Sequence, residues 1–382
     1  MTNPESVWKS RAETVAREVL AGHAADVDRA GRWPSESVEA LSKAGLLGLT
    51  VPDSLGGAGA RPGIFAAVTG VLAEQCASTA MIYLMHLCAT QVIVGAPAFP
   101  FRESVLRAIA AGRHLSTLAL SEKGSRSHFW APMSQVVVEG DRHRLSAAKS
   151  WVTSAGKADS YIVNTGSTEH SDLTDSTLYY VPRETAGLRV TGSFNGLGLR
   201  GNGSAPMQLE NVTLSASHRI SDDGAGFPLM METVFPWFQI GSAAVSLGIA
   251  RAATEGIRQH LLASKLEHLG QSLASLMNLR ARLAQMQIAI DTQQAFLEHA
   301  CHEMENPSPT TLRALLESKA AAAEAALEVT DLAMRTGGGA CFSRHLSVER
   351  NFRDARACSV MAPTTDVLHD FIGRTLLDMP LF

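Results

Sequence analysis

The chain has 382 residues, of which 46% are hydrophobic and 18% are charged. This is the balance of a globular protein with enough apolar side chains for a large core, and the length suggests two or three domains. Lys and Arg number 33 and Asp and Glu 37, so the formal net charge is −4. That charge excludes the strong positive footprint expected of a protein that binds nucleic acid or an anionic membrane.

The sequence lacks signals for a membrane, for secretion and for a metal. No window approaches about 18 uninterrupted apolar residues, so we expect no transmembrane helix. The N-terminal segment is amphipathic and acidic, without the apolar stretch of a secretory signal. The five cysteines are scattered, with no CxxC and no Cys/His cluster at ligand spacing. We therefore expect reduced thiols, no metal and a cytoplasmic protein.

Residues 1–114 have the pattern of a helical domain. Apolar side chains recur at helical spacing over 5–29, and a second amphipathic segment begins at the candidate N-cap Ser35 and stops at Gly45. The Gly- and Pro-rich segment that follows is expected to be a loop. Further helices are expected at 63–75 and 103–112, on either side of an apolar stretch.

Residues 115–224 have the pattern of a β-domain. Seven short runs rich in Val, Thr, Tyr and Leu are separated by Gly, Asn, Asp or Pro. Seven strands in about 100 residues predict a small β-barrel or sandwich.

Residues 225–382 return to the helical period. We expect long helices near 231–263, 270–304 and 309–336, a glycine-led loop at 337–346, and shorter helices near 347–358 and 364–376. Short loops between long helices predict an antiparallel four-helix-type bundle. The predicted fold class is therefore α+β, with a helical domain, a central β-domain and a helical bundle in that order.

Two segments of the β-domain have the composition of a ligand site. In LALSEKGSRSHFWAP, at 118–132, a strand runs into a Gly/Ser-rich turn that can present N–H groups and hydroxyls to an anion, although it could equally be a polar hairpin loop. In KSWVTSAGKADSY, at 149–161, Trp151 and Thr153 are expected on one face of a strand. An aromatic ring beside a hydroxyl suits a flat heterocycle, but the same pattern fits an ordinary strand with one buried Trp.

A third segment lies in the bundle, at 333–368. Three glycines end a helix and allow close approach of the backbone. Arg353 and Asp354 are expected to form an ion pair within the bundle or between subunits. Pro363 suits the first turn of the last helix, and Thr364, near the N-terminus of that helix, could meet an anion.

Together and in this order, these segments resemble the acyl-CoA dehydrogenase superfamily of FAD flavoproteins, over essentially the whole chain. LLGLTVPDSLGGAGA is similar to the family's helix-ending segment with its Pro and paired Gly. LSEKGSRSH stands where the family has Thr-Glu-Pro-x-x-Gly-Ser-Asp, and KSWVTSAGKAD where it has Lys-x-Trp-Ile-Thr-Asn. GLGLRGNGSAPMQLENVTL replaces the Gly-x-Arg-x-Ser segment, and GGG and VERNFRDAR have the family spacing. Five segments in register indicate this fold and a flavin.

The resemblance implies FAD as the cofactor and gives roles to matching residues. Leu120, Ser121 and Ser127 would line the flavin and pyrophosphate side of the β-domain loop, Trp151 would cover the isoalloxazine, and Thr153 would hydrogen-bond near N5. Gln271, Gly337, Gly338 and Gly339 would contact the adenosine half across a subunit interface, and Thr364 and Asp366 the pyrophosphate and ribitol region. Sharing the cofactor in this way implies a homodimer or, more usually in the family, a homotetramer.

The resemblance fails at the catalytic base. Family dehydrogenases remove a weakly acidic α-proton with a carboxylate, and such a proton requires a base within hydrogen-bond reach. Aligning RDARACSVMAPTTDV puts Ala362 at the usual Glu. Members that carry the Glu on the first long bundle helix would place it on or near Pro236, with Glu232 about one turn away.

Two histidines could replace the base. His86 lies on an apolar helix that in this family backs the flavin cavity, although it could be a core histidine bonded to the backbone. His128 lies at the substrate-facing turn.

The function implied is therefore that of a FAD-dependent oxidoreductase acting on an acyl-CoA thioester, with an atypical or missing base and an electron-transfer partner. The alternative is an oxygen-activating flavin monooxygenase or oxygenase of the same fold, in a biosynthetic or catabolic pathway, with molecular oxygen as a substrate. A flavin-binding protein without turnover is a third possibility.

Overall fold

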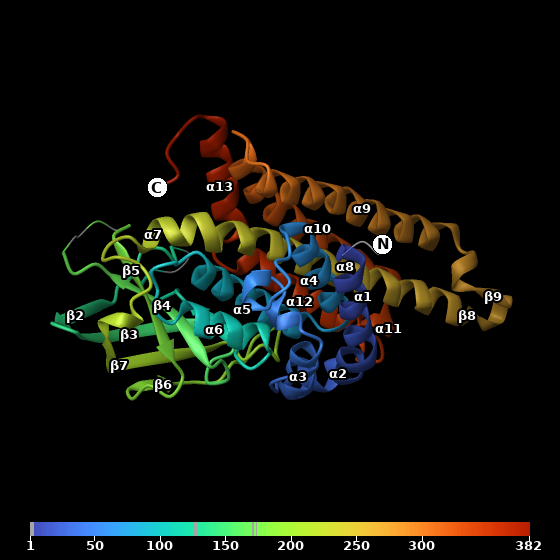
Figure 1. Ribbon diagram of the computed structural model, residues 1–382. Helices are drawn as coiled ribbons and strands as arrows, with labels where there is room; N and C mark the ends of the chain where they lie inside the picture. The colour runs from blue at the N-terminus through green and yellow to red at the C-terminus, as the bar shows by residue number, and fades with distance from the viewer. Residues whose placement is uncertain (1–3, 126–127, 170–171, 173) are drawn as a thin grey trace.

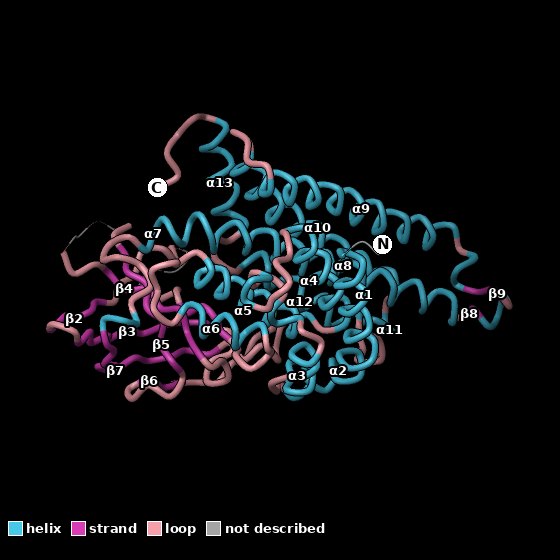
Figure 2. Tube along the Cα trace, in the orientation of Figure 1, coloured by secondary structure: helices cyan, strands magenta, loops and turns pink. Residues whose placement is uncertain are grey.

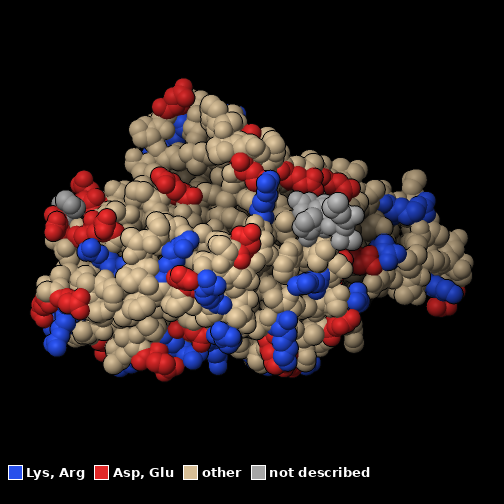
Figure 3. Space-filling model, viewed as in Figure 1, with Lys and Arg blue, Asp and Glu red and all other residues tan. Residues whose placement is uncertain are grey.

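The computed structural model describes residues 4–125, 128–169, 172 and 174–382. Helices form both ends of the chain and the strands gather at one end of the molecule (Figures 1 and 2). The predicted order of a helical region, a β-region and a helical bundle is confirmed. Acidic and basic side chains are interspersed over the face seen in Figure 3, as the small net charge leads one to expect.

The N-terminal region is helical throughout. Its helices are α1 (Pro4–Val15), α2 (Ala21–Ala30), α3 (Ser35–Lys43), α4 (Pro62–Gln75), α5 (Ala77–Val94) and α6 (Arg102–Ala110), with a π-helical turn η1 (Ala16–Leu20) between α1 and α2. The predicted loop contains two short 3₁₀ turns, η2 (Leu46–Gly48) and η3 (Asp53–Leu55). Helix α5 is buried on all sides because other elements surround it, which explains its lack of an amphipathic pattern.

The β-region is a sandwich of two sheets. The strands are β1 (Ser116–Ala119), β2 (Gln135–Glu139), β3 (Arg142–Val152), β4 (Ser160–Gly166), β5 (Ser176–Pro182), β6 (Leu188–Val190) and β7 (Ala205–Ser215). One sheet has the order β1-β4-β5 and the other β2-β3-β7-β6. The pair β1 and β4 is parallel and the other pairs in these two sheets are antiparallel. A 3₁₀ turn, η4 (Ala216–His218), leads out of the sandwich.

The C-terminal region is a bundle built around one long buried helix. Its elements are α7 (Gly226–Leu229), the π-helical turn η5 (Met230–Val234), α8 (Phe235–Ala263), α9 (Met277–Glu305), α10 (Thr311–Gly337), α11 (Gly339–Phe342), α12 (Val348–Val360) and α13 (Thr365–Leu376). Helices α5 and α7 to α8 are long and apolar enough to span a membrane, but 89% and 83% of their apolar windows are buried inside the protein. They are core helices of this fold.

Two predicted boundaries in the bundle are wrong. Residues 270–276 do not belong to the long α-helix, because 265–272 form a small hairpin, β8 (Lys265–Leu266) and β9 (Gln271–Ser272), between α8 and α9. Two 3₁₀ turns, η6 (Glu267–Leu269) and η7 (Leu273–Ser275), accompany the hairpin. The expected loop at 337–346 contains the short helix α11. The hairpin projects from the bundle at the end opposite the β-sandwich (Figure 1).

The three regions are joined at the segment that contains Leu199. Arg353 of α12 forms a two-pronged ion pair with Asp28 of α2, at 2.9 and 2.6 Å, and a second with Glu349 on its own helix. Asp354 accepts a hydrogen bond from the backbone N–H of Leu199 at 2.6 Å. Arg353 and Asp354 therefore serve different partners, and the ion pair predicted within the bundle or between subunits instead joins the bundle to the N-terminal helices of the same chain.

Candidate active site

A buried ion pair holds the start of the Gly/Ser-rich loop. Lys149 Nζ lies 2.5 Å from the Glu122 carboxylate, and the two side chains are 0% and 4% exposed. The same ammonium donates to the backbone oxygen of Asn164 at 2.6 Å and to its side-chain oxygen at 2.8 Å. The Glu122 carboxylate also accepts from the Met133 N–H at 2.8 Å and the Ser134 hydroxyl at 2.6 Å. Both ends of the loop are thus attached to one buried charge pair.

Burial shifts the pKa of the lysine in this pair. It lowers the pKa of Lys149 to about 8, against the attraction of Glu122, because a cation loses hydration in the protein interior. A buried pair of this kind stays ionised only while both partners are present, since a single buried charge is far less stable.

Aromatic packing fixes the other half of the loop against the bundle. The Trp130 ring lies 5.9 Å from Phe371 of α13 and 4.9 Å from Phe382, the last residue of the chain. Phe382 also contacts Phe227 of α7 at 5.1 Å. The loop that carries Ser121 and His128 is therefore held between the β-sandwich and the C-terminal helix.

Trp151 occupies an unusual position in β3. Its φ is +56°, in the left-handed region that bulky residues rarely adopt, and the pairing of β3 with β7 shifts between Lys149 and Val152. This bulge leaves the indole 68% exposed, with an edge-on contact to Phe194 at 6.3 Å. A large aromatic ring held in solvent by a strained backbone fits the stacking of a flat ligand ring.

The expectation that Trp151 and Thr153 share one face is wrong. The bulge breaks the alternation of the strand, so that Thr153 is only 1% exposed while Trp151 faces solvent. Thr153 Oγ1 lies 3.2 Å from the Ser204 hydroxyl, and the Thr153 carbonyl accepts from Thr117 Oγ1 at 3.0 Å. Its predicted contact with a flavin stays a prediction.

Ala362 lies in a short link, residues 361–364, that joins α12 to α13. Lys319 of α10 is 0% exposed and donates to the backbone oxygens of Met361 at 3.1 Å and Pro363 at 2.5 Å, on either side of Ala362. Its ammonium also lies 5.6 Å from the centre of the Phe238 ring. The residue at the position of the usual carboxylate is therefore an alanine, and a buried cation binds the backbone oxygens on either side of it.

Two neutral polar side chains of α8 are buried near the same link. Gly256 of α8 lies against Val348, and Ser246 is hydrogen-bonded to Cys358, so α8 and α12 run antiparallel. Because the two helices are antiparallel, Ser242 and Gln239, about one and two turns before Ser246 on α8, lie toward the C-terminal end of α12. Within the part of the chain that the structure describes, neither the Gln239 amide nor the Ser242 hydroxyl has a hydrogen-bond partner.

The structure separates the three candidate bases. His86 is 0% exposed; its Nδ1 accepts from the Ser116 N–H at 3.1 Å and its Nε2 donates to the Leu47 oxygen at 3.0 Å. Burial lowers the pKa of His86 to about 4. With both ring nitrogens occupied, His86 is not presented to a substrate, and the alternative of a core histidine describes it. Glu232 is exposed on η5, and His128 is exposed beside Trp130 at 5.1 Å.

The predicted cofactor residues fall into two groups. Leu120 is buried, Ser121 is half-buried and Ser127 lies outside the described residues. Thr364 caps α13 through its side chain, Asp366 is exposed in the first turn of the helix, and the Thr365 hydroxyl is buried without a partner among the residues described. A helix N-terminus with an unpaired hydroxyl fits an anionic group such as a pyrophosphate.

The second group lies at the other end of the molecule. Gln271 is exposed on the β8–β9 hairpin, and Gly337–Gly339 join α10 to α11, whereas Trp151 belongs to the β-sandwich (Figure 1). Gly338 has a φ of +55°, which favours glycine, and a Cβ on Gly337 would lie 2.1 Å from Cys341 Sγ. The hairpin that carries Gln271 thus projects at the end of the molecule opposite the β-sandwich that carries Trp151 (Figure 1).

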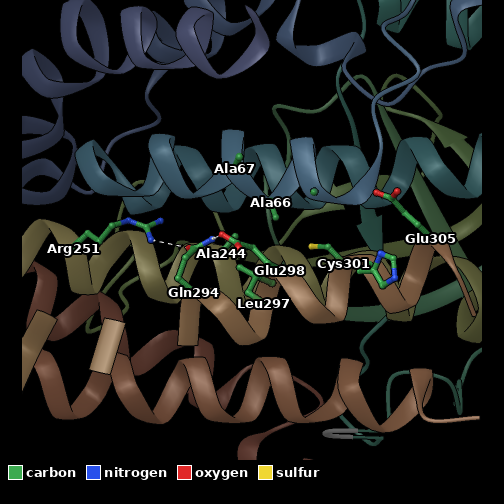
Figure 4. Close-up of a pocket in the computed structure, with 11 residues that line it drawn as sticks. Ala66, Ala67, Ala244, Arg251, Gln294, Leu297, Glu298, Cys301 and Glu305 are labelled. Atoms are coloured by element: carbon green, nitrogen blue, oxygen red, sulfur yellow. Dashed lines mark hydrogen bonds between the residues drawn. The ribbon is translucent and has the colours of Figure 1, made fainter. Parts of the chain in front are cut away.

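A separate cavity of about 260 Å³ lies between α4, α8 and α9 (Figure 4). Small side chains such as Ala66 and Ala244 line one side, and Arg251 donates to Gln294 at 3.0 Å across it. None of the predicted site residues that the structure describes lines this cavity. It is therefore distinct from the candidate active site.

The chain therefore consists of a helical region, a β-sandwich with an exposed tryptophan at a bulge, and a helical bundle. Comparison with known families agrees. The N-terminal, middle and C-terminal domains of acyl-CoA dehydrogenase match residues 3–113, 117–212 and 224–377. The chain belongs to the acyl-CoA dehydrogenase superfamily of flavoprotein oxidoreductases, whose members depend on FAD.

Individual relatives span the same length. The chain is 27% identical to a probable acyl-CoA dehydrogenase, YngJ, of Bacillus subtilis, covering 99% of both chains. The solved structure of butyryl-CoA dehydrogenase from Megasphaera elsdenii superposes with a TM-score of 0.92 at 22% identity, covering 99% of each chain. That of the prolyl acyl carrier protein oxidase AnaB gives 0.90 at 19% identity, covering 98% of this chain and 99% of that one.

Lys319, Gln239 and Ser242 were not among the site residues predicted from the sequence. Lys319 could have been predicted, because it is a lone cation on the apolar face of an alanine-rich helix. The sequence evidence for Gln239 and Ser242 is weaker: they are polar residues inside an otherwise apolar segment. Only the packing of the helices shows that Lys319 binds the 361–364 link.

Proposed function

We propose that this protein binds FAD and oxidises an acyl thioester without a carboxylate at position 362. The observation that carries the proposal is Ala362 itself, on a link whose two flanking carbonyls are held by Lys319. FAD supplies the two-electron acceptor when bound. The residues that fit it are the exposed Trp151, the N-terminus of α13 with Thr364, and the loop that begins at Ser121.

The chain's own residues define which substrates can react. A simple saturated acyl-CoA has a weakly acidic α-proton and requires a strong base. His86 is enclosed, and Glu232 and His128 are exposed to solvent in the single chain. We therefore propose a thioester whose C–H bond is already acidified by a neighbouring group, and poor reaction with simple saturated esters.

The second candidate is an oxygen-activating monooxygenase or oxygenase. It is favoured by the same methyl group at position 362, because apolar walls suit oxygen access better than proton removal. The fold does not decide between the two, since its solved neighbours include a dehydrogenase and an oxidase.

Assembly is part of the proposal. We propose a cytoplasmic homotetramer, or a homodimer, in which a neighbouring subunit supplies Gln271 and Gly337–Gly339 to the cofactor. Support comes from the hairpin that carries Gln271, which projects at the end opposite the β-sandwich (Figure 1), and from exposed apolar side chains on and near it: Leu262, Leu269 and Met277. A monomer in size-exclusion chromatography with saturating FAD would contradict this assembly. Reduced flavin would pass its electrons to a protein partner.

The decisive experiment is an anaerobic titration of the FAD-loaded protein with a panel of CoA esters, followed by flavin absorbance. We expect bleaching by an ester with an acidified C–H and little or none by butyryl-CoA. Efficient bleaching by butyryl-CoA would refute the missing base. No bleaching by any ester, together with oxygen transfer to a substrate by the reduced protein, would instead establish the oxygenase. Neither activity would leave a flavin-binding protein without turnover.

A further inference from the structure

Lys319 is a buried cation without a carboxylate partner. No Asp or Glu oxygen lies within 4.0 Å of its ammonium among residues 4–125, 128–169, 172 and 174–382. An isolated buried ammonium is costly, and an apolar side chain would suit the surrounding alanines of α10 better. The positive charge of Lys319 therefore has a role other than packing.

The contacts of Lys319 indicate this role. Within the residues that the structure describes, its two hydrogen bonds end on carbonyls of the 361–364 link, those of Met361 and Pro363. Met361 is the C-terminal cap of α12, where the helix dipole places negative charge, and the Phe238 ring offers its face to the same ammonium. These neutral groups stabilise the cation at the link.

The link has few other attachments. The Met361 N–H donates to Ala357, at the end of α12, and Thr364 accepts from Leu368, at the start of α13. Pro363 has no N–H group to donate. Between the two helix ends, Met361 and Ala362 pack against the core, and Lys319 donates two hydrogen bonds to the backbone on either side of Ala362.

We infer that Lys319 is a positioning residue, which fixes the 361–364 link and with it the direction of Ala362 and Thr364. The inference rests on the proposed function for the statement that these two residues face the flavin and the reacting carbon. Lys319 itself need not touch either, because it acts through the backbone of the link.

The test compares Lys319→Met with a matched control on the same helix. Thr330→Val is that control, because Thr330 is 0% exposed and bonds only to carbonyls of α10, those of Ala326 and Leu327. Hydrogen–deuterium exchange of the full chain, read on peptides covering 356–370, measures the link directly. We expect exchange there to be about tenfold to a hundredfold faster in Lys319→Met, since bonds to a charged group are lost, and unchanged in Thr330→Val.

The second readout is the cofactor. The FAD dissociation constant should rise about tenfold in Lys319→Met, with a shifted flavin absorbance, and stay near the wild-type value in Lys319→Arg, which keeps the cation. If the methionine variant does not fold, Lys319→Gln, whose neutral amide reaches one carbonyl, should loosen the link to an intermediate extent.

The outcomes separate this inference from the proposed function. Unchanged exchange at 356–370 in Lys319→Met and Lys319→Gln would overturn the positioning role, as would equal loosening in Thr330→Val. A loosened link with unchanged FAD affinity and spectrum would support the role of Lys319 at the link and count against the proposed cofactor contact of Thr364.

Discussion

Replacing Lys149 by methionine tests how far the buried ion pair supports the loop at 121–134. The substitution leaves the Glu122 carboxylate, 4% exposed, with only the Met133 N–H and the Ser134 hydroxyl as donors. It also removes the ammonium from two oxygens of Asn164, of which the backbone oxygen keeps the Ser134 hydroxyl at 3.4 Å. Removing one member of a buried pair costs about 3–5 kcal/mol, so Lys149→Met should lose stability on that scale.

A double-mutant cycle isolates the electrostatic part. Glu122→Gln keeps a side-chain amide near the loop but removes the charge, so that combined with Lys149→Met no unpaired charge remains. We expect the double variant to be about 2–3 kcal/mol more stable than the sum of the single effects predicts. The control is Arg107→Met, which breaks an exposed pair with Glu103, at 53% and 66% exposure, and should cost less than about 1 kcal/mol.

The assay is urea unfolding of the full chain, monitored by circular dichroism and by Trp fluorescence. Lys149→Met should lower the urea midpoint well beyond the effect of Arg107→Met and should weaken FAD binding, because the loop that carries Ser121 is released. A Lys149→Met midpoint equal to that of the exposed control, or effects that simply add in the double variant, would refute the reasoning.

Three further predictions concern the candidate site. Ala362→Glu should raise anaerobic flavin reduction by butyryl-CoA by about 100-fold or more, whereas Ala362→Gln, of the same size but without a base, should not; equal rates in the two would exclude a missing base. Thr153→Val should keep the fold and FAD but slow flavin reduction by about 1–3 kcal/mol, and an unchanged rate would remove Thr153 from the site. His86, with a pKa lowered by burial from 6.5 to about 4, is neutral in the folded protein while the unfolded chain takes up a proton. The stability it contributes is present above pH 6.5 and is lost as the pH falls toward 4, by about 3 kcal/mol, a loss that the non-titrating His86→Gln should not show in urea unfolding.

Local patterns account for much of what could be predicted. The seven strands and most helices follow from side-chain periodicity and from Gly and Pro, which act over a few residues and do not depend on distant contacts. The family resemblance likewise rests on short segments in order along the chain. The predicted helix from 270 failed because only pairing with the residues after α8 makes 271–272 a strand.

The sequence by itself determined the order of the three regions, the family and the absence of a carboxylate at position 362. The tertiary structure alone decided what surrounds that position. Lys319 is 43 residues from Ala362 in the sequence, yet the packing of α10 against α12 brings its ammonium to the two carbonyls beside Ala362. Trp151 looked like one residue of a regular strand, but a bulge set by pairing with β7 turned it outward and Thr153 inward. Such contacts depend on chain segments far apart in sequence, where periodicity carries no information about which side chains meet.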